Sequence, residues 1–404
     1  ALEKALQDKG LAVLVAPPGA GKTTLVPIRL LGAPWRGDGM IILLEPRRLA
    51  ARAAARRMAF MLGEEVGQTV GYRMRLDQKT SAKTRILVVT EGVFARMALD
   101  DPELTGVNAV LFDEFHERSL DADLGLALAL EIRDGFRPDL RLLVMSATLD
   151  GARVSQILGD APVIEAQGRA FPIDISHLDR KPDERLDEVM ARAVMKTLGE
   201  EAGSILAFLP GTGEINGVAR RLEGRLPPDV RLYLLHGTME PAAQDEAIRP
   251  APVGIRKVVL ATSIAETSIT IDGVRAVIDC GYQRLPVFEP ATGLTRLETV
   301  RASKASVDQR AGRAGRTAPG IALRLWNAAQ TASLPDFTPP EILAADLTGL
   351  LLDLATFGVT DPAQTRFLDP PPAPALNEAR DLLQRLGALD EGGRLTDAGM
   401  QMRR

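Results

Sequence analysis

Short apolar runs alternate with longer polar or amphipathic segments over the first part of the chain. Five such runs occur: LAVLVA (11–16), MIILLE (40–45), RILVV (85–89), NAVLF (108–112) and RLLVM (141–145). Strands that are apolar along their whole length are typical of a parallel sheet covered on both faces by helices. Each spacer is long enough for a crossover helix. The pattern therefore predicts an α/β domain over residues 1–165.

The same alternation starts again further along the chain. The second set of runs is SILAFL (204–209), VRLYLL (230–235), KVVLAT (257–262), VRAVIDC (274–280) and IALRLW (321–326). It predicts a second α/β domain over residues 166–335, with the same architecture as the first.

The last part of the chain has a different character. An apolar segment (342–358) lies between proline-rich stretches, and a helical pattern (378–389) and a Gly-Gly turn follow it. These features predict a small, mostly helical, winged-helix-like domain over residues 336–404. Because Arg404 comes directly after the start of a helix, we expect the sequence to be part of a longer chain.

The amino-acid composition limits the classes of protein to which this chain can belong. The content is 46% hydrophobic and 25% charged, as in a soluble globular protein, and no apolar run reaches the roughly 18 residues of a membrane span. No signal peptide is recognisable, and the single cysteine, Cys280, excludes an internal disulfide and a cysteine-based zinc site. We expect a cytoplasmic protein that does not bind membranes, with Cys280 buried at the end of a strand.

The net charge of −4 argues against a protein that coats nucleic acid non-specifically, but it leaves room for a local basic channel. Such a concentration of charge exists at Arg47, Arg48, Arg52, Arg56 and Arg57. Arg47 and Arg48 directly follow an apolar run, so they are candidates for phosphate contacts at the end of a strand. A solvated amphipathic helix is the alternative interpretation.

The stretch APPGAGKTT (16–24) joins the first apolar run to a helical pattern. It differs from the phosphate-binding sequence G-x-x-x-x-G-K-[ST] only at Ala16. In such a loop, backbone N–H groups and the helix N-terminus face phosphate oxygens. Lys22 would reach the β- and γ-phosphates of a nucleotide, and the Thr23 hydroxyl would bind Mg²⁺. The expected phosphate loop consists of Gly19, Ala20, Gly21, Lys22, Thr23 and Thr24.

The stretch DEFHER (113–118) follows the fourth apolar run. The C-terminal ends of parallel strands line the ligand crevice of a sheet. We therefore expect Asp113 and Glu114 at the metal, with Asp113 holding Mg²⁺ through water and Glu114 orienting the attacking water. An acidic strand-to-helix loop is the alternative. His116 is expected to connect this site to the second domain, and SAT (146–148) to couple to the carboxylates.

The stretch QRAGRAGR (309–316) combines three arginines with two glycines. Gln309, Arg313 and Arg316 lie at positions i, i+4 and i+7, which predicts one face of a single helix. Gly312 and Gly315 would allow another surface to approach that face closely. Guanidinium groups so placed suit phosphate recognition, whereas a solvated basic helix is the alternative.

Taken together, the motifs resemble those of superfamily 2 helicases of the DEAH/RHA group. The series is GAGKTT, EPRRLAA, TEG, DEFH, SAT, FLPG (208–211), ATSIAETSITIDG (261–273) and QRAGRAGR, and it covers nearly the whole chain. DEFHERSLDADL (113–124) looks most like the bacterial HrpB type. The resemblance implies two RecA-like parallel-sheet domains and an ATP-dependent RNA helicase.

The resemblance also implies roles for residues around the nucleotide. Gln309 would position the lytic water, and Arg313 and Arg316 would act as arginine fingers on the γ-phosphate, approached by the first domain with its nucleotide. The γ-phosphate sensor would be Ser268, and Thr270 and Asp272 would contact the ribose and nucleotide.

Two positions depart from the pattern of the group. Arg57 matches one side of the stack around the base, but Ile248 stands where the group has phenylalanine. We therefore expect weak base selectivity and the use of other NTPs besides ATP. Phe115 replaces the alanine of DEAH and must pack differently.

The remaining matches concern RNA. The positions that correspond to RNA-backbone contacts are Arg48, Arg75 and Thr90 in the first domain and Thr262 and Ser263 in the second. Residues 282–300 resemble a β-hairpin wedge with a turn near Ala291 to Gly293.

The resulting expectation is a monomeric, ATP-driven translocase that moves 3′→5′ on single-stranded RNA or on a tailed RNA duplex. A DNA helicase with the same motor and a nucleotide-switched RNA-binding clamp are the alternatives. A small-molecule P-loop kinase does not explain the second α/β domain or QRAGRAGR.

Overall fold

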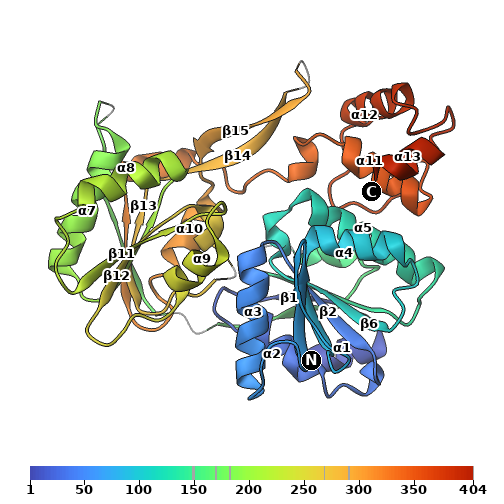
Figure 1. Cartoon of the computed structure of the whole chain (residues 1–404), viewed down its shortest axis with the longest axis horizontal. Coiled ribbons are helices and arrows are strands. Elements are labelled where there is room, and N and C mark those ends of the chain that lie inside the picture. The colour runs from blue at the N-terminus through green and yellow to red at the C-terminus, as the bar shows by residue number, and fades with distance from the viewer. Residues whose placement is uncertain (148–150, 169–170, 182, 268, 290–291, 404) are drawn as a thin grey trace. The chain divides into compact units, whose positions relative to one another are not determined.

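Two β-sheets, each with its own hydrophobic core, organise the chain (Figure 1). The computed structural model describes residues 1–147, 151–168, 171–181, 183–267, 269–289 and 292–403. Unit 1 comprises Ala1–Gln167, Val287–Arg296 and Pro339–Arg404, and unit 2 comprises Gly168–Pro286 and Leu297–Thr338. The boundaries expected near residues 165 and 335 stay predictions.

Unit 1 contains an eight-stranded sheet of order β4-β3-β5-β2-β6-β7-β1-β8. Within this sheet the pair β3–β4 is antiparallel, and the other described pairs are parallel. The five strands predicted from the apolar runs are confirmed, whereas β3, β4 and β8 are additional. The strands are β1 (Leu11–Val15), β2 (Met40–Glu45), β3 (Val70–Met74), β4 (Asp77–Lys79), β5 (Ile86–Thr90), β6 (Val107–Phe112), β7 (Arg141–Ser146) and β8 (Val163–Glu165).

Helices cover both faces of this sheet, which is why its strands are apolar on both sides. Ala12 and Leu14 of β1 pack in the cluster that includes residues of α1 (Leu2–Asp8), α2 (Lys22–Leu30) and α3 (Arg48–Met61). Val13 points to the opposite face, in the cluster with α4 (Glu91–Asp100), α5 (Leu120–Gly135) and α6 (Gly151–Ile157). The alternation follows from the two-residue period of a strand.

The C-terminal part of unit 1 is mostly helical, as expected, and packs on the side of α4 and α5. It contains α11 (Thr348–Phe357), α12 (Ala373–Arg385) and α13 (Asp397–Met402). Leu350, Leu354 and Leu383 share the hydrophobic cluster of α4 and α5.

Two helix boundaries in this part differ from those predicted. The helix predicted over 342–358 begins only at Thr348, and Glu341–Leu343 form a separate 3-10 turn before it. The helix predicted over 378–389 spans Ala373–Arg385 instead.

Unit 2 contains a six-stranded sheet of order β11-β12-β10-β13-β16-β9, whose described pairs are all parallel. Its strands are β9 (Ile173–His177), β10 (Ser204–Phe208), β11 (Val230–Leu235), β12 (Arg256–Ala261), β13 (Val274–Asp279) and β16 (Gly320–Arg324). The predicted five strands are confirmed, and β9 is an additional edge strand. The helices are α7 (Leu186–Glu200), α8 (Thr212–Leu222), α9 (Pro241–Ile248) and α10 (Lys304–Ala311). Cys280 is buried directly after β13, as expected, and burial raises the pKa of its thiol to about 12.

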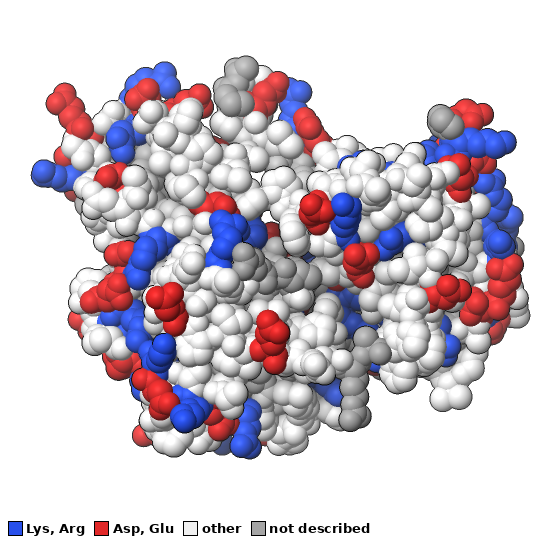
Figure 2. Space-filling view, turned by 180° about the vertical axis from the view of Figure 1, so that it is seen from behind, with Lys and Arg blue, Asp and Glu red and all other residues white. Residues whose placement is uncertain are grey.

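A separate two-stranded ribbon is formed by β14 (Tyr282–Glu289) and β15 (Leu294–Arg301), as predicted (Figure 1). Ala291, at the predicted turn, lies outside the described residues. Among the described helices, none is long and apolar enough to cross a membrane. On the face seen in Figure 2, side chains of both charges are interspersed, without a large region of one sign.

Candidate functional site

The loop between β1 and α2 has the backbone shape of a phosphate-binding loop. Gly19 and Gly21 have φ values of 84° and 79°, in the left-handed region that favours glycine. A residue with a Cβ at Gly21 would be strained by this φ and would displace the Leu25 side chain, which lies 2.6 Å from the Cβ position. Lys22 begins α2, and the backbone N–H groups of its first turn are therefore at the end of the helix that attracts anions.

Two side chains of this loop meet the two carboxylates that follow β6. The Lys22 ammonium donates to Glu114 at 3.1 Å, and the Thr23 hydroxyl donates to the Asp113 carboxylate. Lys22, Asp113 and Glu114 are all buried. The structure thus brings together the residues that the sequence predicted for phosphate and metal binding.

Burial and charge act against each other in this group. Burial raises the pKa of Asp113 to about 6, although the nearby Lys22 acts to lower it. Burial acts to lower the pKa of Lys22, but Glu114 and Asp113 outweigh it and raise that pKa above its usual value. Near neutral pH the site therefore holds a lysine cation and an Asp113 carboxylate side by side.

Glu114 has an unusual backbone conformation for its residue type. Its φ of 48° and ψ of 33° lie in the left-handed region, and its N–H donates to the Asp113 carboxylate at 2.8 Å. Non-glycine residues rarely adopt this conformation, which concentrates at functional sites. The turn after β6 therefore fixes the direction in which Glu114 points.

His116 joins two of the predicted motifs within unit 1. Its Nδ1 accepts the backbone N–H of Ala147 at 3.3 Å, and its Nε2 lies 3.4 Å from the Glu114 carboxylate. This contact links the ends of β6 and β7. Thr148 of SAT lies outside the described residues, and the expected connection from His116 to the second domain stays a prediction.

The oxygen atoms at and around Thr23 are suitable ligands for a small, hard cation. A hydroxyl and a carboxylate oxygen lie together, and Mg²⁺ in nucleotide sites is held by one or two such protein groups together with phosphate oxygens. Among the described residues, no group of three or more His, Cys, Asp or Glu side chains forms a separate metal site. Thr23 and Asp113 therefore fit the predicted Mg²⁺.

The residues predicted to contact RNA in unit 1 lie at one edge of its sheet. Thr90 ends β5 opposite Glu45 of β2, and Arg48 begins α3 shortly after β2. Arg75 is exposed in the turn that follows β3, the other neighbour of β5. Arg47 donates to Glu117 at 2.9 Å, a partner that the sequence did not reveal.

In unit 2, the predicted single helix over QRAGRAGR is wrong. The helix α10 ends at Ala311, Gly312 is its C-cap, and Arg313 and Arg316 follow outside it. Nε of Arg313 donates to the Glu266 carbonyl at 2.8 Å, and Nη1 of Arg316 donates to the Thr270 hydroxyl at 2.5 Å. The Glu266 carbonyl and the Thr270 hydroxyl thus bind the two arginines that follow the end of α10.

The expected role of Gly315 also needs correction. A Cβ there would lie 2.7 Å from the Phe171 carbonyl, and Phe171 donates its N–H to Gly315 O at 3.0 Å. The surface that approaches this glycine is therefore the segment before β9 of the same unit, rather than a nucleotide-bearing domain.

The other predicted residues of unit 2 lie around the ends of its strands. Thr262 follows β12, Ser263 begins a 3-10 turn (Ser263–Ala265), and Asp272 is exposed before β13. Gln309 is buried near the end of α10, whereas Ser268 lies outside the described residues.

The two residues expected at the nucleotide base lie in different units. In unit 1, Arg57 is exposed on α3 and lies 5.7 Å from the centroid of the exposed Phe60 ring. Ile248 ends α9 in unit 2. Their joint role at the base stays a prediction.

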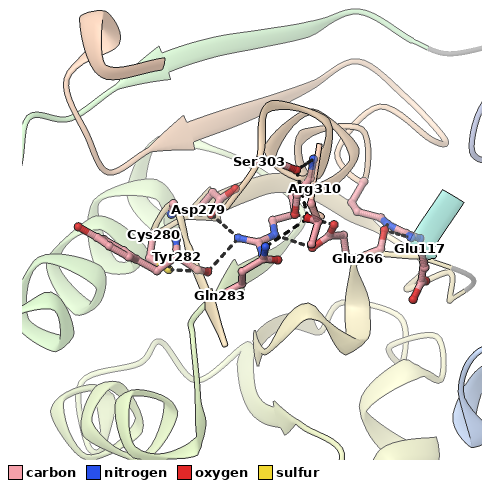
Figure 3. A network of polar contacts seen from close by, with 12 residues as sticks. Glu117, Glu266, Asp279, Cys280, Tyr282, Gln283, Ser303 and Arg310 are labelled. Carbon is pink, nitrogen blue, oxygen red and sulfur yellow. Dashed lines mark hydrogen bonds and ion pairs between the residues drawn. The ribbon is translucent and has the colours of Figure 1, made fainter. Parts of the chain in front are cut away.

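Arg310, the most enclosed charge of QRAGRAGR, is not among the residues predicted from the sequence. Its side chain donates to Glu266 at 2.9 Å, to Asp279 at 3.0 Å and to the Tyr282 carbonyl at 3.2 Å (Figure 3). It is only 1% exposed, and although burial opposes its charge, Asp279 and Glu266 raise its pKa above the usual arginine value. Arg310 thus joins Glu266, the end of β13 and the start of β14.

Comparison with known proteins decides the family. The model for the DEAD/DEAH box helicase matches residues 1–157, the one for the helicase conserved C-terminal domain matches 182–318, and the one for the winged-helix, helicase-associated domain (HA2) matches 379–404. The chain belongs to the DEAD/DEAH box helicases. The resemblance to the DEAH/RHA group is confirmed, as is the expected fold of two parallel-sheet α/β domains with a winged-helix region.

Individual relatives agree with this assignment to the DEAH-box helicases. ATP-dependent RNA helicase HrpB of Escherichia coli (strain K12) is 53% identical over 390 residues, which cover 96% of this chain and 48% of that protein. The pre-mRNA-splicing factor ATP-dependent RNA helicase DEAH10 of Arabidopsis thaliana is 36% identical over 451 residues, covering 100% of this chain and 63% of that protein. The predicted similarity to the HrpB type is thus confirmed, although the chain spans only about half the length of HrpB.

Solved structures give the same result. A crystal structure of the E. coli DEAH/RHA helicase HrpB superposes with a TM-score of 0.93 at 51% identity, covering 100% of this chain and 51% of that chain. A crystal structure of the E. coli DExH-box NTPase HrpB gives a TM-score of 0.86, also at 51% identity, and 50% of that chain is covered.

The buried charges around Arg310 lead to a stability prediction for this DEAH-box chain. Arg310→Met leaves Asp279 and Glu266 without their cation, so we expect it to lower the free energy of unfolding by about 3–5 kcal/mol. Urea unfolding followed by circular dichroism measures the change. Arg192→Met, which removes an exposed ion pair with Glu184, serves as a control and should change stability little. Equal, small effects of both substitutions would contradict a structural role for Arg310.

Proposed function

We propose that this chain carries the nucleotide-driven motor of an ATP-dependent RNA helicase. The observation that supports this most strongly is the buried group of Lys22, Thr23, Asp113 and Glu114, in which a phosphate-binding loop meets two carboxylates. Lys22 and the loop N–H groups bind the β- and γ-phosphates. Glu114, fixed by its turn, orients water toward the γ-phosphorus and accepts its proton.

Thr23 and Asp113 would hold Mg²⁺, which would neutralise negative charge on the phosphates during phosphoryl transfer. Gln309 positions the lytic water, and Arg313 and Arg316 stabilise the developing charge on the γ-phosphate. Other nucleoside triphosphates serve beside ATP, because Ile248 offers no aromatic ring to stack on the base.

RNA is held mainly through its backbone. In unit 1 the contacts are made by Arg47, Arg48, Arg75 and Thr90, and in unit 2 by Thr262 and Ser263. A strand bound in this way is not read by sequence, since phosphate contacts carry no base information. The β14–β15 ribbon separates the strands of a duplex as the chain, acting as a monomer in the cytoplasm, moves 3′→5′.

Strand separation tests this proposal. We expect ATP-dependent separation of an RNA duplex with a 3′ single-stranded tail, and little separation of the same duplex with a 5′ tail. Gel electrophoresis of labelled duplexes measures both rates. Equal rates with the two tails would contradict the direction, faster separation of DNA would favour a DNA helicase, and ATP turnover without separation would favour a nucleotide-switched clamp.

A further inference from the structure

We propose that unit 2 contains a second anion site, which binds one phosphate group of the nucleic-acid strand between the root of the β14–β15 ribbon and Trp326. The proposal rests on the nucleic-acid function proposed above. It concerns a pocket that lies apart from the motifs and is formed where β9, β13 and β16 end.

The pocket is lined by basic and aromatic side chains. Its volume of about 390 Å³ is in the lower part of the range of ligand pockets, roughly 300–1,000 Å³. The lining includes Arg180, Tyr282, Arg301, Trp326 and Gln330, and no carboxylate is present among the described lining residues. The pocket therefore has two positive charges without a counter-ion of its own.

Two aromatic rings hold the Arg301 side chain in place. The carbon of its guanidinium lies 4.9 Å from the centroid of the Tyr282 ring and 5.4 Å from that of Trp326. Trp326 is itself fixed, because its indole N–H donates to the Thr331 hydroxyl at 3.0 Å. The stack orients the guanidinium plane in advance, which lowers the entropy lost when a ligand binds.

One guanidinium nitrogen of Arg301 lacks a hydrogen-bond partner among the described residues. Its Nη2 is buried and makes no hydrogen bond with any described residue. Buried donors are nearly always hydrogen-bonded, and each one without a partner requires an explanation, such as a ligand. Arg180 makes no ion pair in the described part of the chain and donates only to the Glu184 carbonyl, at 2.9 Å.

These features favour a phosphate group carried by a nucleic-acid strand. Guanidinium groups bind phosphate through paired, charge-assisted hydrogen bonds. The half-buried ring of Tyr282 and the Gln330 amide offer a neighbouring nucleotide a stacking surface and a polar contact. Tyr282 begins β14 and Arg301 ends β15, so the phosphate would be held at the base of the ribbon proposed to separate strands.

The position of Trp326 allows binding to be measured directly. The chain contains only two tryptophans, Trp35 and Trp326, so Trp35→Phe leaves a single fluorescent reporter in the pocket. In this background, titration with a short single-stranded RNA should change the emission of Trp326 saturably. Adding Arg301→Met should weaken RNA binding about tenfold, since a charge-assisted hydrogen bond is lost.

The salt dependence and two further variants make the test specific. Losing one phosphate contact should make the slope of log K against log salt less steep by about 0.7 for a single strand. Arg231→Met, on the opposite edge strand β11, should leave binding and slope unchanged. Arg180→Met should weaken binding without disturbing the ring stack, and it replaces Arg301→Met if that variant fails to fold. NTP turnover without RNA should be the same in all of them.

Each outcome decides the proposal. If the single-tryptophan protein binds RNA and both Arg301→Met and Arg180→Met bind it equally well, the second anion site is wrong while the proposed function stands. If the single-tryptophan protein binds no nucleic acid, both the second anion site and the proposed function are wrong. If inorganic phosphate or a nucleoside monophosphate alone saturates the emission change and RNA binding does not respond to Arg301→Met, the site serves a free phosphate and the assignment to a strand is overturned.

Discussion

Glu114→Gln is expected to reduce the NTP turnover number by about 10²–10⁴-fold, because the amide cannot accept a proton from the attacking water. The substitution preserves the size of a side chain that is buried beside Lys22. Nucleotide affinity should change far less than turnover, because Lys22 and the loop N–H groups remain. Steady-state kinetics and equilibrium binding of a fluorescent nucleotide measure the two quantities.

Glu117→Gln is the matched control for this prediction. Glu117 lies three residues further along and pairs with Arg47 on unit 1, so its amide variant should turn over nucleotide at nearly the wild-type rate. Comparable losses in the two variants would mean that the turn after β6 is merely sensitive to substitution. Turnover that survives Glu114→Gln would exclude Glu114 as the base.

Arg316→Ala is expected to lower the turnover number by about 10³-fold or more, the effect of removing an arginine finger. Arg316 suits this role better than Arg313 in the described state. Arg313 is buried against the Glu266 and Ile269 carbonyls, whereas Arg316 is partly exposed and contacts the exposed Thr270. Single-turnover hydrolysis at saturating ATP measures the chemical step without the contribution of binding.

Two further variants test whether the effect belongs to the position of this guanidinium. Arg316→Lys keeps the charge but loses the paired N–H groups, so turnover should recover only in part. Arg275→Ala removes a partly exposed arginine of unit 2 that donates to the Pro319 carbonyl, and it should leave turnover unchanged. A fully active Arg316→Ala variant would show that γ-phosphate stabilisation comes from elsewhere.

The sequence predicted the central strands of both sheets because these strands are buried on both faces and read as continuous apolar runs. Most of the strands it missed are short or lie at edges, and the exception is β3, which has five residues and lies between β4 and β5. β4 and β8 have only three residues each, and β9 is largely exposed, so no apolar run marks them. Parallel pairing of β9 with β16 depends on residues far away in the chain.

The phosphate loop and the DEFH turn were predicted correctly in their placement because both directly follow apolar runs. The arrangement of QRAGRAGR was not, because helical spacing says nothing about where a helix ends. Gly312 closes α10, and the carbonyls of Glu266 and Ile269 then bind Arg313 and Arg316. Arg310 escaped notice because its partners Glu266 and Asp279 are 44 and 31 residues away.

Steady-state ATP hydrolysis without nucleic acid, with single-stranded RNA and with single-stranded DNA tests the central claim most directly, with Glu114→Gln giving the background rate. We expect RNA to stimulate turnover strongly, DNA to stimulate it less, and Glu114→Gln to abolish the stimulation. Turnover that neither strand alters, or stimulation that persists in Glu114→Gln, would contradict the central claim.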